Sequence, residues 1–150
     1  MIKKHFNSLT AENVMKPQLI QPQEGTFNWE PADKIVDFAV ANGMKVRGHT
    51  LCWHAQTGEW MFLDKDGKPA SKELALQRLE EHIKTVVTRY KGKVYAWDVL
   101  NEVIVDDTSA TKIYRESSPW VRICGTDFIP LIFKWANEAD PDCQLFYNDY

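Results

Sequence analysis

The stretch "VYAWDVLNEVIVDD", residues 94–107, is a hydrophobic run that stops at an Asn-Glu pair, Asn101 and Glu102, after which the chain becomes acidic. A short apolar run bounded in this way is typical of a strand. The carboxylate at its end raises the question of what a charged side chain does where a hydrophobic strand finishes. The answer depends on how the rest of the chain is organised around this strand.

On both sides of this stretch, short apolar runs alternate with longer segments of helical period. Strands are predicted at residues 6–13, 45–54, 94–102 and 143–149, and helices at residues 32–43, 72–92 and 126–142. Ser71 is a plausible N-cap of the second helix, and Thr126 is the predicted cap of the third. This order of βα units predicts an α/β fold with a parallel sheet, which is either doubly wound or part of a (βα)8 barrel.

The ends of the predicted strands favour one of these two closures. Each strand finishes in polar residues, namely Glu12 and Asn13, the segment 49–54, Asn101 and Glu102, and Asn148 and Asp149. In barrel enzymes the active site is built from the carboxyl ends of several strands. No glycine-rich loop follows the first strand, so a doubly wound nucleotide-binding sheet loses support. The pattern therefore favours part of a (βα)8 barrel.

The composition restricts the classes of protein that remain. With 150 residues, 44% hydrophobic and 26% charged, the chain suits one soluble globular domain. A net charge of −3 gives no broad positive field, which argues against nucleic acid or an anionic membrane as a partner. The three cysteines lack the spacing of a disulfide framework or a metal site, so no metal is expected. No apolar run reaches the length of a membrane span, and the first residues lack the apolar core of a signal peptide.

Five motifs, in order along the chain, resemble the family-10 glycoside hydrolases, the endo-β-1,4-xylanases. They are "SLTAENVMK" (8–16), "VRGHTLCWH" (46–54), "AWDVLNEVI" (96–104), "YRESSPWVRICGTDFI" (114–129) and "LFYNDY" (145–150). The resemblance extends over nearly the whole chain. It implies a (βα)8 barrel of which this chain covers about four βα units, strands two to five of the family.

The resemblance also implies a reaction, the hydrolysis of internal β-1,4-xylosidic bonds in xylan with retention of configuration. Retaining glycosidases use two carboxyl groups about 5–5.5 Å apart, one as acid/base and one as nucleophile, and need no cofactor. Glu102 matches the family's acid/base, which protonates the departing oxygen and later deprotonates the attacking water. The alternative reading of Glu102 is a loop carboxylate that only caps the strand.

Asn101 resembles the family residue that donates a hydrogen bond to the sugar 2-hydroxyl. In a regular strand Asn101 and Glu102 point to opposite faces. Both therefore reach one site only if the end of the strand twists or bulges.

Strict alternation in "RGHTLCWH" puts His49, Leu51 and Trp53 on one face. The resemblance gives His49 and Trp53 roles in the glycone subsites, where His49 binds a hydroxyl and Trp53 offers apolar area to a pyranose. The alternatives are a core histidine and a core tryptophan. His54 is predicted to be structural.

Three residues of "AENVMK", Glu12, Asn13 and Lys16, match the polar group that holds the glycone side. A turn of helix after Asn13 would put Lys16 beside Glu12, and the alternative is an exposed ion pair of little energetic value. At the other end of the chain, Asn148 and Tyr150 resemble residues near the aglycone side.

Judged by the family pattern, residues 1–150 are a partial catalytic domain, truncated at both ends. The first strand would precede Met1, and everything after the fifth strand, including the nucleophilic glutamate, would follow Tyr150. Two exposed sheet edges are then expected, which predicts self-association or pairing with a complementary barrel fragment. Xylan or xylo-oligosaccharides are the expected ligands, and secretion of the parent enzyme is expected by resemblance.

Three functions stay open at this point. The first is the catalytic segment of an endo-xylanase, with Glu102 as acid/base and the nucleophile outside the chain. The second is a non-hydrolytic xylan-binding or self-assembling fragment, which binding without turnover would indicate. The third is a barrel glycosidase acting on another β-1,4-glycan, which substrate profiling would reveal.

Overall fold

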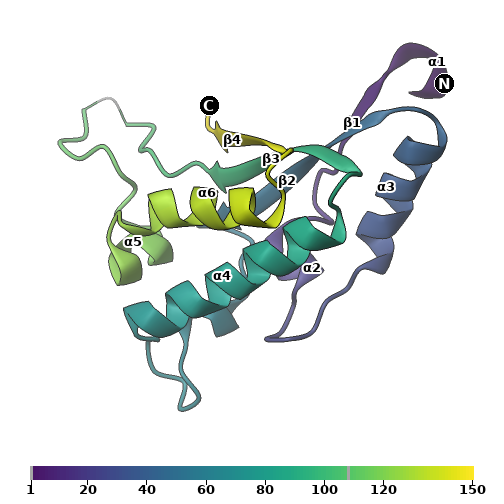
Figure 1. Cartoon of the computed structure of the whole chain (residues 1–150). Coiled ribbons are helices and arrows are strands. Elements are labelled where there is room, and N and C mark those ends of the chain that lie inside the picture. The colour runs from purple at the N-terminus through teal and green to yellow at the C-terminus, as the bar shows by residue number, and fades with distance from the viewer. Residues whose placement is uncertain (1, 108) are drawn as a thin grey trace.

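The computed structural model describes residues 2–107 and 109–150, and over these residues four strands form one parallel sheet in chain order (Figure 1). The strands are β1 (Ser8–Thr10), β2 (Lys45–Trp53), β3 (Val94–Asn101) and β4 (Gln144–Asn148). Each strand pairs in parallel with the next one along the chain. The predicted α/β class with a parallel sheet is confirmed.

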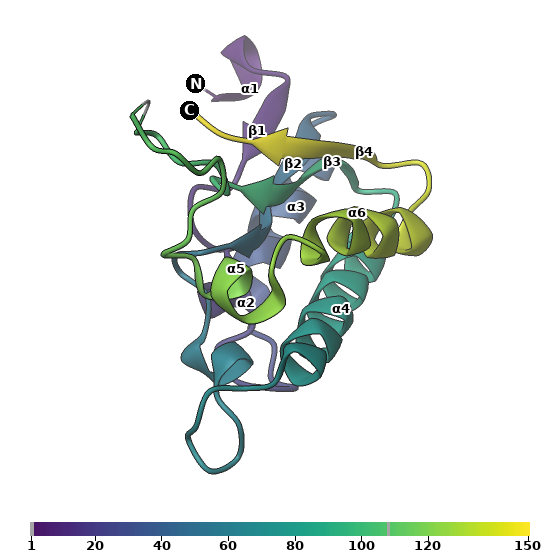
Figure 2. The same cartoon turned by 90° about the vertical axis from the view of Figure 1, so that its left-hand side faces the viewer.

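The predicted helices are also present. The helices are α1 (Ile2–His5), α2 (Pro17–Ile20), α3 (Glu30–Ala41), α4 (Lys72–Arg89), α5 (Pro119–Cys124) and α6 (Phe128–Ala139), together with the 3-10 helix η1 (Glu59–Phe62). Helices α4 and α6 lie side by side below the sheet in both views (Figure 1, Figure 2), and α3 contacts β2. None of the helices in the described part of the chain is both long enough and apolar enough to cross a bilayer.

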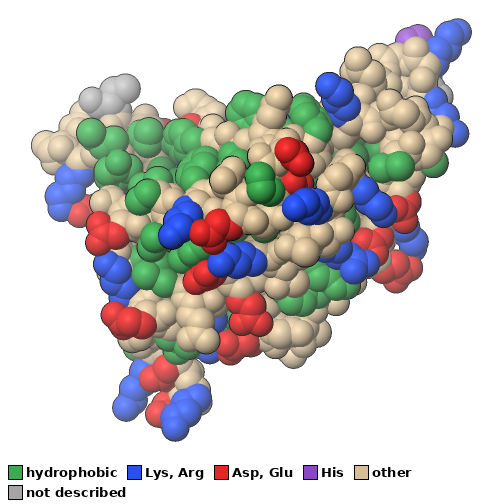
Figure 3. Space-filling model, in the orientation of Figure 1, with side chains coloured by type: hydrophobic (Ala, Val, Ile, Leu, Met, Phe, Trp, Pro, Cys, Tyr) green, Lys and Arg blue, Asp and Glu red, His purple; other side chains and the backbone are tan. Residues whose placement is uncertain are grey.

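The core lies between the sheet and these helices because each long helix buries one apolar face. On α4 the fully buried apolar side chains are Ala75, Leu79, Ile83, Val86 and Val87. Each buried side chain of Leu or Ile size contributes about 1.5–3 kcal/mol relative to exposure. The opposite face of the helix layer carries Lys, Arg, Asp and Glu side chains of both signs (Figure 3), as expected for a solvated surface.

Two predicted helix caps have different outcomes. Ser71 is the N-cap of α4, and its hydroxyl accepts a hydrogen bond from the Leu74 N–H at 3.2 Å, which confirms the prediction. The prediction of Thr126 as the cap of α6 is wrong, because the helix begins at Phe128 with Asp127 as N-cap. The Asp127 carboxylate does not cap the helix and instead accepts from Lys72 at 3.0 Å.

Two further differences concern short elements. The first strand covers Ser8–Thr10 and not residues 6–13, because the chain pairs with β2 only at residues 45–47 and turns away after Thr10. Helix α5 was not predicted, because six residues give no measurable period. Its signal is the Ser118-Pro119 pair, in which proline occupies the first helical position.

Candidate active site

The carboxyl ends of β2, β3 and β4 bring three of the predicted site residues into adjacent positions. Asn101 is the register partner of Trp53 on one side and of Asn148 on the other. Its side chain is buried, and its Oδ1 accepts a hydrogen bond from Asn148 Nδ2 at 2.7 Å. The amide of Asn101 is therefore held in one orientation at the centre of this edge.

Glu102 follows directly after β3 and has a left-handed backbone, with φ of 53°. Its N–H donates to the Asn148 carbonyl at 2.9 Å, and its Oε2 accepts from Trp53 Nε1 at 2.9 Å. A left-handed non-glycine residue costs about 1–3 kcal/mol, and such residues cluster at functional sites. This turn departs from the strand geometry that would send Asn101 and Glu102 to opposite faces.

The strand itself is also irregular near the site. The pairing of β3 with β4 shifts register between Asp98 and Leu100, and the pairing of β2 with β3 shifts between His49 and Cys52. The expected distortion of the strand end is therefore present. The shift between His49 and Cys52 also breaks the strict alternation of side chains along β2. The prediction that Trp53 shares a face with His49 was based on that alternation.

A buried carboxylate, Asp98, organises the middle of the sheet. Its Oδ1 accepts from Arg47 Nε at 3.0 Å and from Arg47 Nη2, and its Oδ2 lies 2.9 Å from His49 Nδ1. Thr50 Oγ1 donates to the Asp98 carbonyl at 2.8 Å. Sequence analysis treats Arg47 only as part of a motif, and no local signal pairs it with a residue 51 positions away.

The environment of Asp98 keeps its side chain ionised. Burial raises its pKa, but the hydrogen bonds from His49 and Arg47 outweigh burial, so the pKa lies below its usual value. An ionised carboxylate only accepts hydrogen bonds, so Nδ1 of His49 carries the donor proton. Nε2 of a neutral His49 is then an acceptor that is free to meet a ligand.

Lys16 contacts Asn13 and not Glu12. Its Nζ donates to Asn13 Oδ1 at 2.9 Å and to Gln56 Oε1 at 2.7 Å, and it lies 4.9 Å from the centre of the Trp53 ring. The alternative reading, an exposed ion pair between Lys16 and Glu12, is wrong, because Asn13 and Gln56 hold the ammonium group. The two side chains form no ion pair within residues 2–107 and 109–150.

An open hollow of about 630 Å³ connects several of these residues. Its lining includes Glu12, Lys16, Arg47, His49, Asp98 and Asn148. Of the residues predicted for the glycone side, Glu12 and Lys16 from the loop after β1 and His49 from β2 line the hollow. Asn13 and Trp53 are not among its lining residues. Cations and carboxylates both line the hollow, which suits a ligand rich in hydroxyl groups better than one of a single charge.

Tyr150 lies apart from this hollow. Its side chain is 78% exposed, and its hydroxyl donates to Asp106 Oδ2 at 3.0 Å. Asp106 also faces Arg115 Nη2 at 3.6 Å, and Arg115 Nε donates to the Glu102 carbonyl at 3.1 Å. Asp106 and Arg115 were not predicted as site residues, because the segment between β3 and α5 has no periodic pattern.

His54 packs edge to face against Trp53, with ring centres 5.8 Å apart. Burial, followed by the nearby Arg115 charge, lowers its pKa and favours the neutral ring. Its buried Nδ1 has no hydrogen-bond partner in the part of the chain that the structure describes. Across the same residues, no group of three or more His, Cys, Asp or Glu side chains could hold a metal ion.

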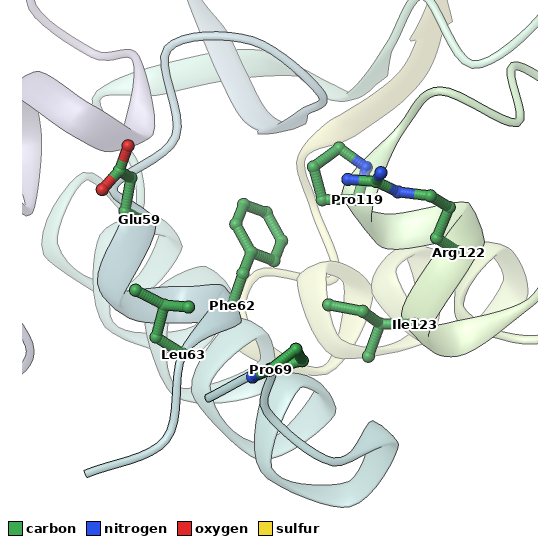
Figure 4. Close-up of a pocket in the computed structure, with 7 residues that line it drawn as sticks. All are labelled: Glu59, Phe62, Leu63, Pro69, Pro119, Arg122 and Ile123. Carbon is green, nitrogen blue, oxygen red and sulfur yellow. The ribbon is translucent and has the colours of Figure 1, made fainter. Parts of the chain in front are cut away.

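A second pocket, of about 550 Å³, lies between η1, the loop that follows it and α5 (Figure 4). Its walls are mainly apolar, from Phe62, Leu63, Pro119 and Ile123, with Glu59 and Arg122 on opposite sides of the opening. No predicted site residue lines it. The predicted site residues lie instead at the carboxyl ends of the strands, where Glu102 is found.

Comparison with known sequences gives a consistent result. The sequence profile of glycosyl hydrolase family 10 matches residues 1–150. Endo-1,4-beta-xylanase B of Paenibacillus barcinonensis is 53% identical over 149 residues, which are 99% of this chain and 44% of that protein. Endo-1,4-beta-xylanase A of Caldicellulosiruptor saccharolyticus is 53% identical over 150 residues, 43% of its length. The chain thus spans less than half the length of these relatives.

Solved structures agree with the sequences. A xylanase from Paenibacillus barcinonensis, complexed with a conduramine derivative, has a TM-score of 0.95 and 54% identity over 99% of this chain and 44% of its own. A mutant structure in complex with xylotriose has a TM-score of 0.94 and 50% identity, again over 99% and 44%. These matches confirm the predicted fold class, with the parallel sheet as the part that is covered.

Proposed function

Because this chain belongs to glycosyl hydrolase family 10, we propose that it provides the general acid/base and one side of the substrate cleft of a retaining endo-1,4-β-xylanase. The observation that carries the proposal is Glu102, held in a left-handed turn between Trp53 and Asn148 at the carboxyl end of the central strand. The names of the relatives support xylan as the substrate.

In this proposal Glu102 protonates the departing glycosidic oxygen and afterwards takes a proton from the attacking water. Asn101 donates to the 2-hydroxyl of the sugar, because its Oδ1 is occupied by Asn148 while its Nδ2 can donate. That hydrogen bond strengthens as positive charge develops on the sugar ring in the transition state.

The glycone side of the cleft would be formed by the hollow. His49 accepts from a hydroxyl through Nε2 while Asp98 holds its other nitrogen. Glu12, Asn13 and Lys16 supply further partners for hydroxyl groups, and Trp53 supplies apolar area. Tyr150 would contact the aglycone side, whereas Asn148, which the resemblance also assigns to that side, lines the hollow itself and would sit near the boundary between the two sides.

The nucleophile is proposed to come from outside residues 1–150. Double displacement needs a second carboxylate about 5–5.5 Å from the acid/base. Asp98 is committed to Arg47 and His49, and no described contact joins Glu12 to Glu102. The chain on its own would then bind xylo-oligosaccharides without cleaving them.

Reconstitution tests this proposal. The chain is purified and mixed with the parts of Paenibacillus barcinonensis xylanase B that precede and follow the matched segment, and reducing-sugar release from xylan is measured. We expect no turnover from the chain alone, and turnover in the mixture that falls at least about 100-fold with Glu102→Gln. Glu81→Gln, at an exposed position of α4, is the matched control, with unchanged turnover.

Three outcomes would contradict the proposal. Turnover by the chain alone that survives Glu102→Gln would mean that other groups perform the chemistry. Binding of xylotriose by the chain, with no turnover in a mixture that demonstrably assembles, would instead favour a non-hydrolytic xylan-binding role. Faster turnover of cellulose or mannan than of xylan would identify another β-1,4-glycan as the substrate.

A further inference from the structure

The backbone of Glu102 is fixed from a segment that the proposed mechanism does not use, residues 103–117. Arg115 reaches back from this segment, and its Nε donates to the Glu102 carbonyl at 3.1 Å while its Nη2 donates to the Ile104 carbonyl at 3.2 Å. Only 16% of the Arg115 side chain is exposed. One planar guanidinium thus binds two carbonyls on either side of Val103.

These contacts occur at a residue whose backbone conformation is unfavourable for a side chain other than glycine. Glu102 is one of two non-glycine residues with positive φ among those described, and its N–H and carbonyl are both satisfied by distant groups. The N–H bonds to the Asn148 carbonyl and the carbonyl accepts from Arg115. A left-handed glutamate persists only when surrounding contacts determine it, and Arg115 supplies one of the two backbone contacts.

Arg115 is itself held at the base of a hairpin. Its N–H donates to the Val103 carbonyl at 2.8 Å, Ile104 and Tyr114 form an antiparallel bridge, and Val105 N–H donates to the Ile113 carbonyl at 2.9 Å. These backbone contacts hold the Arg115 backbone beside Val103, within reach of the Glu102 turn.

The same guanidinium also faces the opposite end of the site. Its Nη2 lies 3.6 Å from Asp106 Oδ1, and Asp106 Oδ2 accepts from the Tyr150 hydroxyl at 3.0 Å. A continuous series of polar contacts thus joins the Glu102 carbonyl, Arg115, Asp106 and Tyr150. Tyr150 is mostly exposed, so a ligand can reach its ring.

We propose that Arg115 is a positioning residue that fixes the Glu102 turn and couples it, through Asp106, to Tyr150. A sugar unit bound against Tyr150 orders the tyrosine, which fixes Asp106 and strengthens its pairing with Arg115. Because coupling between sites is reciprocal, a fixed Glu102 turn also favours binding at Tyr150. The roles of Glu102 and Tyr150 in this inference rest on the proposed function, whereas the contacts that join them do not.

Hydrogen exchange tests the first half of the inference without any enzymatic activity. Exchange of the Glu102 backbone N–H and of the Trp53 indole N–H is measured by NMR in the 150-residue chain and in Arg115→Met. We expect exchange of both protons to accelerate about tenfold or more, as loss of a hydrogen bond to a charged donor implies. Arg115→Lys should restore little of this protection, because one ammonium cannot reproduce the guanidinium fork.

Lys112→Met is the matched control, since Lys112 lies in the same segment and forms an exposed ion pair with Glu116. It should leave exchange at Glu102 unchanged. A merely structural role of Arg115 would lower the melting temperature and accelerate exchange throughout the chain in equal measure. Unaltered exchange at Glu102 in Arg115→Met would overturn the positioning role.

A double-mutant cycle tests the coupling to Tyr150. The affinity for xylotriose is measured for Arg115→Met, Tyr150→Phe and the double variant, since Tyr150→Phe keeps the ring and removes only the hydroxyl. We expect the double variant to lose at least about threefold less affinity than the product of the single losses, because both changes interrupt one series of contacts. Independent, multiplicative losses would overturn the coupling.

The two arms separate this inference from the proposed function. If the unmodified chain does not bind xylotriose, the proposed ligand is wrong, while the exchange experiment still decides the role of Arg115. In that case Tyr150→Phe is also measured by exchange. Faster exchange at Glu102 would support the coupling, and unchanged exchange would overturn it.

Discussion

The central and outer strands of the sheet contrast sharply, although they belong to the same parallel sheet. Seven of the eight residues of β3 are buried, and Trp97, Val99 and Leu100 are almost inaccessible. In β4, by contrast, no residue is buried, and Phe146 and Tyr147 are 37% and 38% exposed. Over the described residues β3 has a neighbour on each side, while β4 has one.

This contrast divides the candidate site into two halves. The central strands provide Trp53, Asn101 and Glu102, whose side chains are joined to one another or to Asn148 by hydrogen bonds. The outer strands and the turns that follow them provide residues such as Glu12 and Tyr150, which lie at open positions. Neighbouring strands on both sides therefore fix the positions of Trp53, Asn101 and Glu102. The positions of Glu12 and Tyr150 are less constrained, because the edges beside them are open.

The largest expected effect tests the packing of the central strands. Trp97 is 1% exposed, and a Cβ placed on Gly48 would lie 2.1 Å from its ring, so the glycine leaves the space that the indole fills. We expect Trp97→Ala to lower the free energy of unfolding by about 3–5 kcal/mol, from lost burial and the cavity left behind. Urea denaturation measures this. A loss below about 1 kcal/mol would mean that the central strands are not tightly packed.

A smaller effect is expected from Asp98, whose side chain links the two central strands. Asp98→Asn should lower the free energy of unfolding at pH 7 by about 1–2 kcal/mol, because the hydrogen bonds to Arg47 and His49 lose their charge assistance. The pKa of Asp98 is lowered in the folded state, since those hydrogen bonds outweigh the opposing effect of burial.

The sign of the pH dependence follows from that lowered pKa. A carboxyl with a depressed folded-state pKa contributes stability above its unfolded value of about 4, and loses it as pH falls through the folded value. The difference between the unmodified chain and Asp98→Asn should therefore shrink below about pH 4. Urea denaturation at pH 7 and at pH 3 measures this difference, and a constant gap would show that the charge of Asp98 contributes nothing.

The same contrast explains which structural features were predictable. The central strand β3 was predicted at residues 94–102 and occupies Val94–Asn101, because a strand buried on both faces has a nearly continuous apolar sequence. The outer strand β1 was predicted at residues 6–13 and covers only Ser8–Thr10. A strand at the edge of a sheet accepts more residue types than a central one. The sequence therefore indicates poorly where such a strand begins and ends.

Within the site, residue types were predictable and their contacts were not. The motifs identified Glu102, Trp53 and Lys16, but the hydrogen bond between Trp53 and Glu102 joins residues 49 positions apart. Lys16 is held by Gln56, which is 40 positions away and has no motif of its own. The left-handed turn at Glu102 is equally hidden, because a glutamate carries no intrinsic preference for positive φ.

The smallest expected effect concerns the outer strand. The ring of Phe146 lies 4.7 Å from the Arg47 guanidinium, and Phe146 is the register partner of Asp98, so it shares the face that carries the hollow. Because the ring is partly exposed, Phe146→Ala should cost the isolated chain less than about 1 kcal/mol, the size of an exposed cation–π contact. Urea denaturation of the variant beside Trp97→Ala gives the ratio of outer to central packing.

The same variant, measured with and without the complementary parts of a relative, tests whether β4 gains a neighbouring strand on assembly. If the complementary parts of a relative complete the barrel, with a strand paired against β4, the ring of Phe146 becomes buried, and Phe146→Ala should then weaken assembly by about 2–3 kcal/mol. Tyr95→Ala on the central strand β3, at a side chain that is 37% exposed, is the matched control and should weaken assembly little. Equal costs for Phe146→Ala with and without the complementary parts would mean that β4 stays an edge. The difference in burial between β3 and β4 would then be a property of this four-stranded sheet, and would not depend on a further strand beside β4.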